Sequence, residues 1–176
     1  MPMSVGTRLG PYEIVAPLEA GGMARRPAAM QREYVTTSSI RAPAAAVWSI
    51  LTDAAGYADW NPEILGVDGR MALNERIKAR VRVGGGAIRA VSLRVTAFDE
   101  ASRRMEWTGG LPLGLFVGRR ILSVTPRDGG SEFRMDLRMS GPLAPLILKS
   151  LGDRQPEIDS FSAALRARAE QPGPSR

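Results

Sequence analysis

The sequence of 176 residues predicts one α+β domain, in which an antiparallel sheet packs against helices. Through the middle of the chain, apolar and polar residues alternate in successive runs, and short turns rich in glycine or aspartate separate these runs. Apolar residues at helical spacing follow in residues 142–170, and a shorter apolar helical stretch occupies 44–53. Strands grouped together, with helices near both ends of the domain, are typical of this class.

Seven segments are predicted to be strands. Residues 32–40 are rich in β-branched side chains. Residues 75–83 alternate strictly, with Ile77, Ala79 and Val81 on one face and basic residues on the other. The other predicted strands are one that begins after Pro62 and the segments 87–98, 103–109, 115–124 and 132–139.

Two short helices are predicted after the first strand. Pro43 suits the first turn of a helix over 44–53, because a proline there lacks an N–H that the helix does not use. Trp48 and Leu51 lie on the apolar side of this helix, which is too short to be stable alone and must therefore dock on the sheet. A second short helix or turn is expected within 53–62.

The C-terminal stretch is predicted to be helical but interrupted. Residues 142–170 carry apolar side chains at mostly helical spacing, and Pro156 falls inside them. Proline removes an amide donor and crowds the preceding turn, so we expect a kink or break between Gly152 and Pro156. Residues 171–176 are expected to form a flexible tail.

The composition excludes several classes of site. The chain has no histidine and no cysteine, which removes Cys/His zinc sites, Ser-His-Asp and Cys-His nucleophile systems, and disulfides. We expect no metal and no cofactor. No apolar run approaches the ~20 residues of a membrane span, and the composition suits a cytoplasmic protein. The net charge of +6 is weak evidence for nucleic acid, and because no aromatic residues interleave with the basic ones we expect no nucleic-acid partner.

The N-terminal segment has its own resemblance. Residues 12–23, YEIVAPLEAGGM, resemble the opening of bacterial serine/threonine kinases, where a G-x-G-x-x-G loop covers the ATP phosphates. Glu19 and Ala24 stand where the first and third glycines would be, and no strand lysine, H-R-D or D-F-G motif follows. We therefore expect residues 1–28 to be a non-functional or disordered leader without ATP chemistry.

The rest of the chain resembles the START-like, helix-grip (SRPBCC) superfamily, and within it the polyketide cyclase/dehydrase-like branch. The resemblance rests on APAAAVWSILTDAAGYADWNPEI (42–64), RRMEW (103–107), GRRILSVTP (118–126) and SEFRMDLRMSGPLAPLI (131–147). It implies a seven-stranded antiparallel sheet wrapped around a long C-terminal helix, with two short helices after the first strand. The expected domain covers residues 29–170.

The resemblance also implies an apolar cavity between the sheet and the C-terminal helix, where a hydrophobic small molecule would bind. Methionines on the inner face would adapt to irregular ligands, or would simply fill a closed core. The predicted ligand-binding residues are Trp48, Trp60, Val81, Leu93, Met105, Trp107, Phe116, Arg120, Leu122, Phe133, Met135, Leu137, Met139 and Leu151.

Arg120 breaks the apolar pattern of the inner face. It shares its parity with Leu122, so it is predicted to face the cavity, where an unpaired charge would cost several kcal/mol. Its partner would be Glu63 or the acidic group of a ligand. Arg89 has an inward parity too, near a strand end where its side chain can reach water.

Three functions remain open at this point. The first is a non-catalytic carrier of a lipid-like, polyketide or other aromatic molecule, which the greasy lining favours. The second is an aromatase/cyclase-type enzyme, in which Arg120, Tyr57 or Asp59 would steer proton transfer. The third is an interaction module similar to the chaperone activators of the same superfamily. The sequence does not indicate an oligomeric state.

Overall fold

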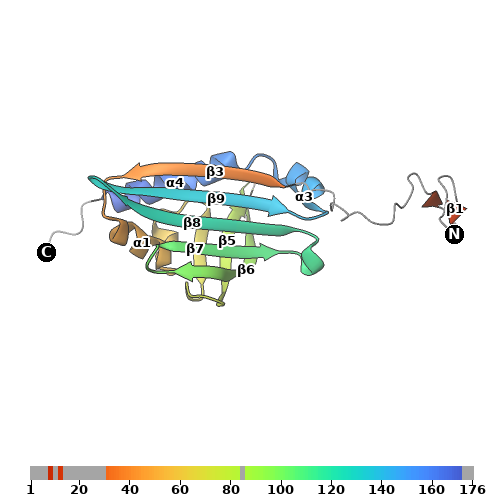
Figure 1. Cartoon of the computed structure of the whole chain (residues 1–176), viewed down its shortest axis with the longest axis horizontal. Coiled ribbons are helices and arrows are strands. Elements are labelled where there is room, and N and C mark those ends of the chain that lie inside the picture. The colour runs from red at the N-terminus through yellow and green to blue at the C-terminus, as the bar shows by residue number, and fades with distance from the viewer. Residues whose placement is uncertain (1–7, 10–11, 14–30, 84–85, 172–176) are drawn as a thin grey trace, which may run out of the picture.

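The computed structural model describes residues 8–9, 12–13, 31–83 and 86–171. Its main feature is a seven-stranded antiparallel sheet that curls around the C-terminal helix α4, which confirms the predicted fold class (Figure 1). The strand order is β3-β9-β8-β7-β6-β5-β4, so the first and last of the seven strands are neighbours. The strands are β3 (Arg32–Ile40), β4 (Ile64–Asp68), β5 (Arg76–Val83), β6 (Ala87–Asp99), β7 (Arg104–Gly110), β8 (Val117–Arg127) and β9 (Gly130–Ser140).

Two short helices follow β3, as predicted. Helix α1 (Ala44–Thr52) buries Val47, Trp48 and Leu51 against the sheet, and α2 (Tyr57–Trp60) follows it. Spacings of one, three and four residues place these apolar side chains on one side of α1, so a helix that is unstable alone is held by packing.

The C-terminal stretch forms two helices rather than one. Helix α3 (Ala144–Leu151) ends at Gly152, whose φ of 72° is accessible to glycine at little cost, and α4 (Gln155–Ala169) begins three residues later. Pro156 lies in the first turn of α4, where its missing N–H has no helical partner to lose. The expected interruption is therefore confirmed as a complete break.

The predicted faces of the strands are also confirmed. On β5, Ile77 and Ala79 are buried, while the basic residues that alternate with them, Arg76, Lys78 and Arg80, are exposed. A bulge between Val95 and Ala97 shifts the register of β6 against β7. Arg89 near the start of β6 is exposed to solvent, as its position at a strand end predicted.

The N-terminal segment is described only in part. Strands β1 (Arg8–Leu9) and β2 (Tyr12–Glu13) pair with each other in a separate two-stranded ladder. The rest of the predicted leader and residues 172–176 of the predicted tail lie outside the described residues. The boundaries of the leader, the domain and the tail therefore stay predictions.

Candidate ligand-binding site

Arg120 lies in the middle of a row of side chains that crosses the inner face of the sheet. In the strand register, Arg120 on β8 is opposite Trp107 on β7 and Leu137 on β9, and Leu137 is opposite Tyr34 on β3. Trp107 and Leu137 are buried, and Arg120 is half-buried. The alternation of β8 thus places a guanidinium among apolar side chains, as predicted.

Aromatic rings surround the end of this row at which Trp107 lies. The ring of Tyr57 on α2 is centred 5.0 Å from that of Trp60 and 5.9 Å from that of Trp107. Phe161 on α4 lies with its ring centre 5.3 Å from that of Trp60, and the guanidinium carbon of Arg120 lies 5.6 Å from the Phe161 ring centre. This last distance is within the range of a cation–π contact.

Local hydrogen bonds fix the position of Trp60. The Asn61 side-chain oxygen accepts hydrogen bonds from the backbone N–H groups of Glu63 (2.9 Å) and Ile64 (2.7 Å), which ends α2 and starts β4. Before α2, the Asp53 carboxylate accepts a hydrogen bond from the Gly56 N–H at 3.2 Å. Asn61 therefore turns the chain immediately after Trp60 and fixes how the tryptophan enters the site.

Arg120 has no acidic partner within the described part of the chain. The ion pairs between described residues do not include it, so the expected pair with Glu63 is not formed. Partial burial beside Phe161 desolvates the Arg120 guanidinium and lowers its pKa below the usual range. A desolvated guanidinium without a carboxylate is a site that an anionic group would stabilise.

Arg154 and Glu157 form an ion pair close to the site. At the start of α4, the buried side chain of Arg154 donates to both carboxylate oxygens of Glu157. Burial raises the pKa of the Glu157 carboxyl above its usual range, and the adjacent Arg154 opposes this shift. The negative charge of Glu157 also acts on Arg120, but only at longer range, because Glu157 forms its ion pair with Arg154.

Further hydrogen-bond donors in this region have no acceptor. The indole N–H groups of Trp60 and Trp107 and the Nε of Arg154 are buried without a partner among the described residues. Buried donors are nearly always paired in folded proteins. A ligand with oxygen acceptors would therefore suit this part of the protein.

Tyr57 and Asp59 do not have the environment of an acid–base pair. The Tyr57 hydroxyl donates a hydrogen bond to the Leu51 carbonyl oxygen at 2.9 Å, and burial raises its pKa above its usual range, so the hydroxyl stays protonated. Asp59 is exposed. Neither of these side chains is placed to take a proton from a molecule beside Arg120.

The inner face is closed at one end and more accessible at the other. Toward α1, the side chains that β7, β8 and β9 place beyond the Arg120 row pack as solid core. The predicted lining residues that are buried are Trp48, Met105, Trp107, Leu122, Phe133, Met135, Leu137 and Met139. Those that are half-buried are Trp60, Val81, Leu93, Phe116, Arg120 and Leu151.

Two glycines face each other in the row next to Arg120. Gly109 on β7 and Gly118 on β8 are opposite each other in the next row of the inner face, and neither carries a side chain. A Cβ added at Gly118 would meet its nearest atom, the Gly109 carbonyl oxygen, only at 3.8 Å, whereas a Cβ at Gly109 would come within 2.5 Å of Leu93. A small group in front of Gly118 would therefore meet its neighbours in ordinary van der Waals contact and not in a clash.

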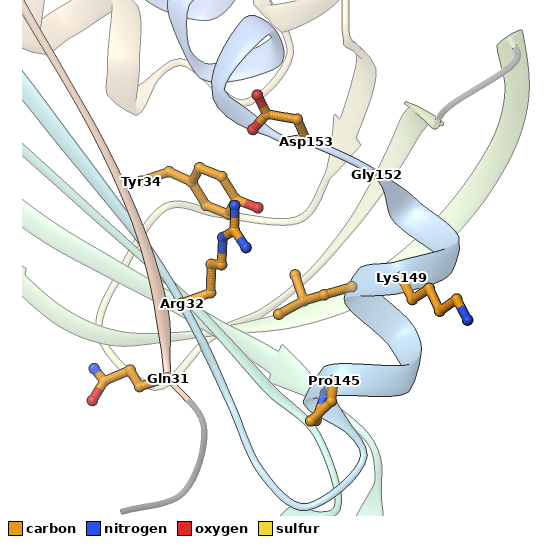
Figure 2. A pocket seen from close by; sticks show the side chains of 8 residues that line it. Gln31, Arg32, Tyr34, Pro145, Lys149, Gly152 and Asp153 are labelled. Atoms are coloured by element: carbon orange, nitrogen blue, oxygen red, sulfur yellow. The ribbon is translucent and has the colours of Figure 1, made fainter.

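A pocket of about 450 Å³ opens beside Tyr34, at the β3 end of the row that contains Arg120, between β3 and helix α3. In Figure 2 the Tyr34 ring and the Arg32 guanidinium point into it, whereas Lys149 points away. Tyr34 lies two strands from Arg120, a separation of about 10 Å, and the volume is within the ~300–1,000 Å³ of small-molecule sites. The residues lining the pocket are Gln31, Arg32, Tyr34, Pro145, Leu148, Lys149, Gly152 and Asp153.

The sequence analysis did not assign Tyr34, Arg154, Glu157 or Phe161 to the site. Alternation along β3 would have placed Tyr34 on the inner face, and Phe161 belongs to the apolar stripe of α4. No pattern in the sequence brings Arg154 and Glu157 to this place, because their position depends on the break before α4.

Two further properties concern the described residues as a whole. They contain no cluster of three or more acidic side chains that could hold a metal ion. None of their helices is long and apolar enough to cross a membrane.

Solved structures with the same fold come from bacteria and plants. The Zhui aromatase/cyclase from Streptomyces sp. R1128 is 18% identical, with a TM-score of 0.65 over 80% of this chain and 94% of that one. A START superfamily protein from Mycobacterium smegmatis is 20% identical, with a TM-score of 0.60 over 78% and 97%. Ginseng major latex-like protein 151 from Panax ginseng is 11% identical, with a TM-score of 0.64 over 80% and 99%.

At these identities the structural neighbours show the fold alone, and no curated protein matches the sequence. The family described as polyketide cyclase / dehydrase and lipid transport matches residues 31–170, which include the whole seven-stranded sheet and both C-terminal helices. The chain therefore belongs to the polyketide cyclase/dehydrase and lipid transport family.

Proposed function

We propose that the protein binds a hydrophobic small molecule that carries an acidic group, in the space between the sheet and α4. The observation that carries this proposal is Arg120, whose desolvated guanidinium has no carboxylate partner among the described residues. A ligand carboxylate or phenolate on Arg120 would supply the missing charge and form charge-assisted hydrogen bonds. The unpartnered indole N–H groups of Trp60 and Trp107 support an oxygen-rich group in the same region.

The apolar part of the ligand would lie toward Gly118 and the half-buried residues Leu93 and Phe116. Burial of apolar surface there contributes about 25 cal/mol per Å², largely independent of the exact shape of the molecule. The acidic group adds selectivity, because a hydrogen bond to a charged group is worth about 1.5–3 kcal/mol.

The side chains around Arg120 suit a protein that binds its ligand better than an enzyme that converts it. The Tyr57 hydroxyl is committed to the Leu51 carbonyl oxygen, and Asp59 is exposed. The name of the Streptomyces neighbour, aromatase/cyclase, makes aromatic polyketides a natural first class of ligand to test.

The experiment compares Arg120→Met with Arg119→Met. Arg119 is adjacent in sequence, but its side chain is half exposed and pairs with Glu106 at 3.3 Å. Each protein is titrated with a fluorescent aromatic carboxylic acid and with the neutral amide of the same molecule. We expect Arg120→Met to lose about tenfold to 100-fold in affinity for the acid, because it loses the hydrogen bond to a charged group. Its affinity for the amide should not change. Arg119→Met should keep both, and equal losses for acid and amide in Arg120→Met would refute the proposed role of Arg120.

A second variant tests the location of the apolar part. A Cβ at Gly118 makes only ordinary van der Waals contacts, the nearest at 3.8 Å, so Gly118→Val should weaken both ligands with little loss of stability. Unchanged binding of the amide to Gly118→Val would exclude the space in front of β8 as the ligand site.

A further inference from the structure

Exposed leucines gather at one end of the molecule. Among the described residues, six large hydrophobic side chains are exposed, and four of them lie in the β7–β8 connection or at the start of α3. Leu113 is the most exposed of these at 97%, and Leu146 on α3 is 68% exposed. We call the group of Leu111, Leu113, Leu115 and Leu146 the apolar lip.

The two parts of the apolar lip are joined by backbone contacts. The Leu143 N–H, one turn before Leu146, donates a hydrogen bond to the Leu115 carbonyl oxygen at 2.9 Å. The Leu111 N–H donates to the Phe116 carbonyl oxygen at 2.9 Å, which closes the base of the β7–β8 connection. The lip is therefore a built part of the fold and not a loose chain end.

The backbone of Leu113 is held in an unfavourable conformation. Its φ of 58° and ψ of 18° belong to the left-handed region, which L-residues other than asparagine and aspartate rarely adopt. The short helix η2 (Pro112–Gly114) thus presents a leucine to solvent at a cost in both backbone and hydration energy. Such a cost is offset where the side chain enters an apolar medium.

The charges around the apolar lip are mainly basic, and Asp153 is the one acidic residue that lines the adjoining pocket. Residues 107–127 and 137–152, which contain the lip, include no aspartate or glutamate. Lys149 is exposed one turn after Leu146 on α3, and Arg32 lies across the pocket from α3. An anionic surface would complement these charges, whereas a second copy of the same lip would repel them.

We propose that the apolar lip docks this end of the protein on an anionic lipid bilayer. Leu113 and Leu146 enter the region below the headgroups, and Lys149 and Arg32 contact the anionic headgroups. Docking in this way would turn the pocket beside Arg32 and Tyr34 toward the bilayer. The proposal does not depend on which molecule the interior binds.

The test measures flotation of the full chain with phosphatidylcholine vesicles that contain or lack phosphatidylglycerol. Leu113→Gln removes the most exposed leucine, and Leu73→Gln is the matched control, because Leu73 is also exposed (54%) but lies outside the lip. We expect binding to the anionic vesicles that weakens about tenfold in Leu113→Gln, since a leucine leaves the apolar phase. Leu73→Gln should bind as the unaltered protein does.

A second pair of variants tests the charge. Lys149→Gln should weaken binding to the anionic vesicles about fivefold, the loss expected for one basic residue near such a surface, and high salt should weaken it further. Arg120→Met should float like the unaltered protein, so failure of this proposal and failure of the ligand proposal are distinguishable.

Three outcomes would overturn the docking proposal. The first is no binding of the unaltered protein to anionic vesicles, and the second is an equal effect of Leu113→Gln and Leu73→Gln. The third is a dimer in sedimentation without vesicles that Leu113→Gln dissolves, because it would assign the lip to a second copy. Leu113→Trp gives an independent readout: its fluorescence should shift to the blue with anionic vesicles, and an unchanged spectrum would contradict insertion.

Discussion

The guanidinium carbon of Arg120 lies 5.6 Å from the centre of the Phe161 ring, so the charge on β8 faces the C-terminal helix. The ring compensates only part of the lost hydration, because a cation–π contact is worth about 0.5–2 kcal/mol. The remaining cost stays in the protein without ligand. This cost is what a bound acidic group would remove.

Arg120→Met is therefore expected to stabilise the protein in the absence of ligand. The change keeps the length of the side chain and removes a desolvated charge, which should raise the free energy of unfolding by about 1 kcal/mol or more. Urea unfolding of Arg120→Met and of Arg119→Met measures this. The second variant removes a half-exposed ion pair and should change stability by less than about 1 kcal/mol. A destabilised Arg120→Met would show that the guanidinium has a stabilising partner.

Two glycines around the β7–β8 connection should respond differently to alanine. A Cβ at Gly110 would collide with the backbone carbonyl of Phe116, so Gly110→Ala should cost about 2 kcal/mol or more. Gly114 has a φ of 69° but open space around it, so Gly114→Ala should cost about 1 kcal/mol from backbone strain alone. Thermal unfolding of both variants checks the order, and equal losses would contradict the close contact at Gly110.

Stability should depend on pH through Glu157. Burial raises the pKa of this carboxyl above its ordinary value of 4.5, so the folded protein holds the proton more tightly than the unfolded chain. The stabilisation from protonation is full below pH 4.5 and is lost as the pH rises through the higher pKa of the folded state. Urea unfolding across this window should show the loss in the unaltered protein and not in Glu157→Gln.

The matched control for this dependence is Asp159→Asn, which removes an exposed carboxylate from the same helix. It should retain the loss of stability above pH 4.5. A pH profile of Glu157→Gln with the same slope as that of the unaltered protein would show that another group is responsible.

Deletion of residues 1–28 is expected to leave the domain folded. The few apolar residues of this segment belong to no amphipathic pattern of the seven-stranded domain. The truncated and full-length chains should have comparable thermal midpoints. A loss of more than about 2 kcal/mol would show that the segment stabilises the sheet.

The alternation of residues was enough to predict the faces of β5 and β8, but not of β6 beyond the bulge between Val95 and Ala97, where the parity reverses. Arg120 could be placed on the inner face because Leu122 shares its parity, and a period of two leaves no other choice within one strand. An interruption before α4 was also predictable, because Pro156 kinks or breaks a helix, but its form as a complete break at Gly152 was not. Local sequence thus specified both orientation and interruption.

The depth of each side chain was not predictable in the same way. Parity does not distinguish Met135, which is packed in solid core, from the half-buried Leu93, because the difference depends on where α1 and α4 cover the sheet. The neighbours of Arg120 come from distant segments: Tyr57 follows the first strand, and Phe161 and Glu157 lie on the last helix. Only the folded arrangement brings these residues together.

The division of the inner face between closed core and half-buried side chains also affects how related proteins can diverge. The buried core cluster includes residues of α1, α4 and the sheet, whereas Val81, Leu93 and Phe116 pack against it only partly buried, so substitutions at these three positions should remove less packing than substitutions within the core. Because proteins tolerate changes that stay above a stability threshold, a lineage can reshape the space beside Arg120 through single substitutions without losing the fold. Divergence in ligand preference should therefore concentrate at these half-buried positions, while the core beneath α1 changes slowly.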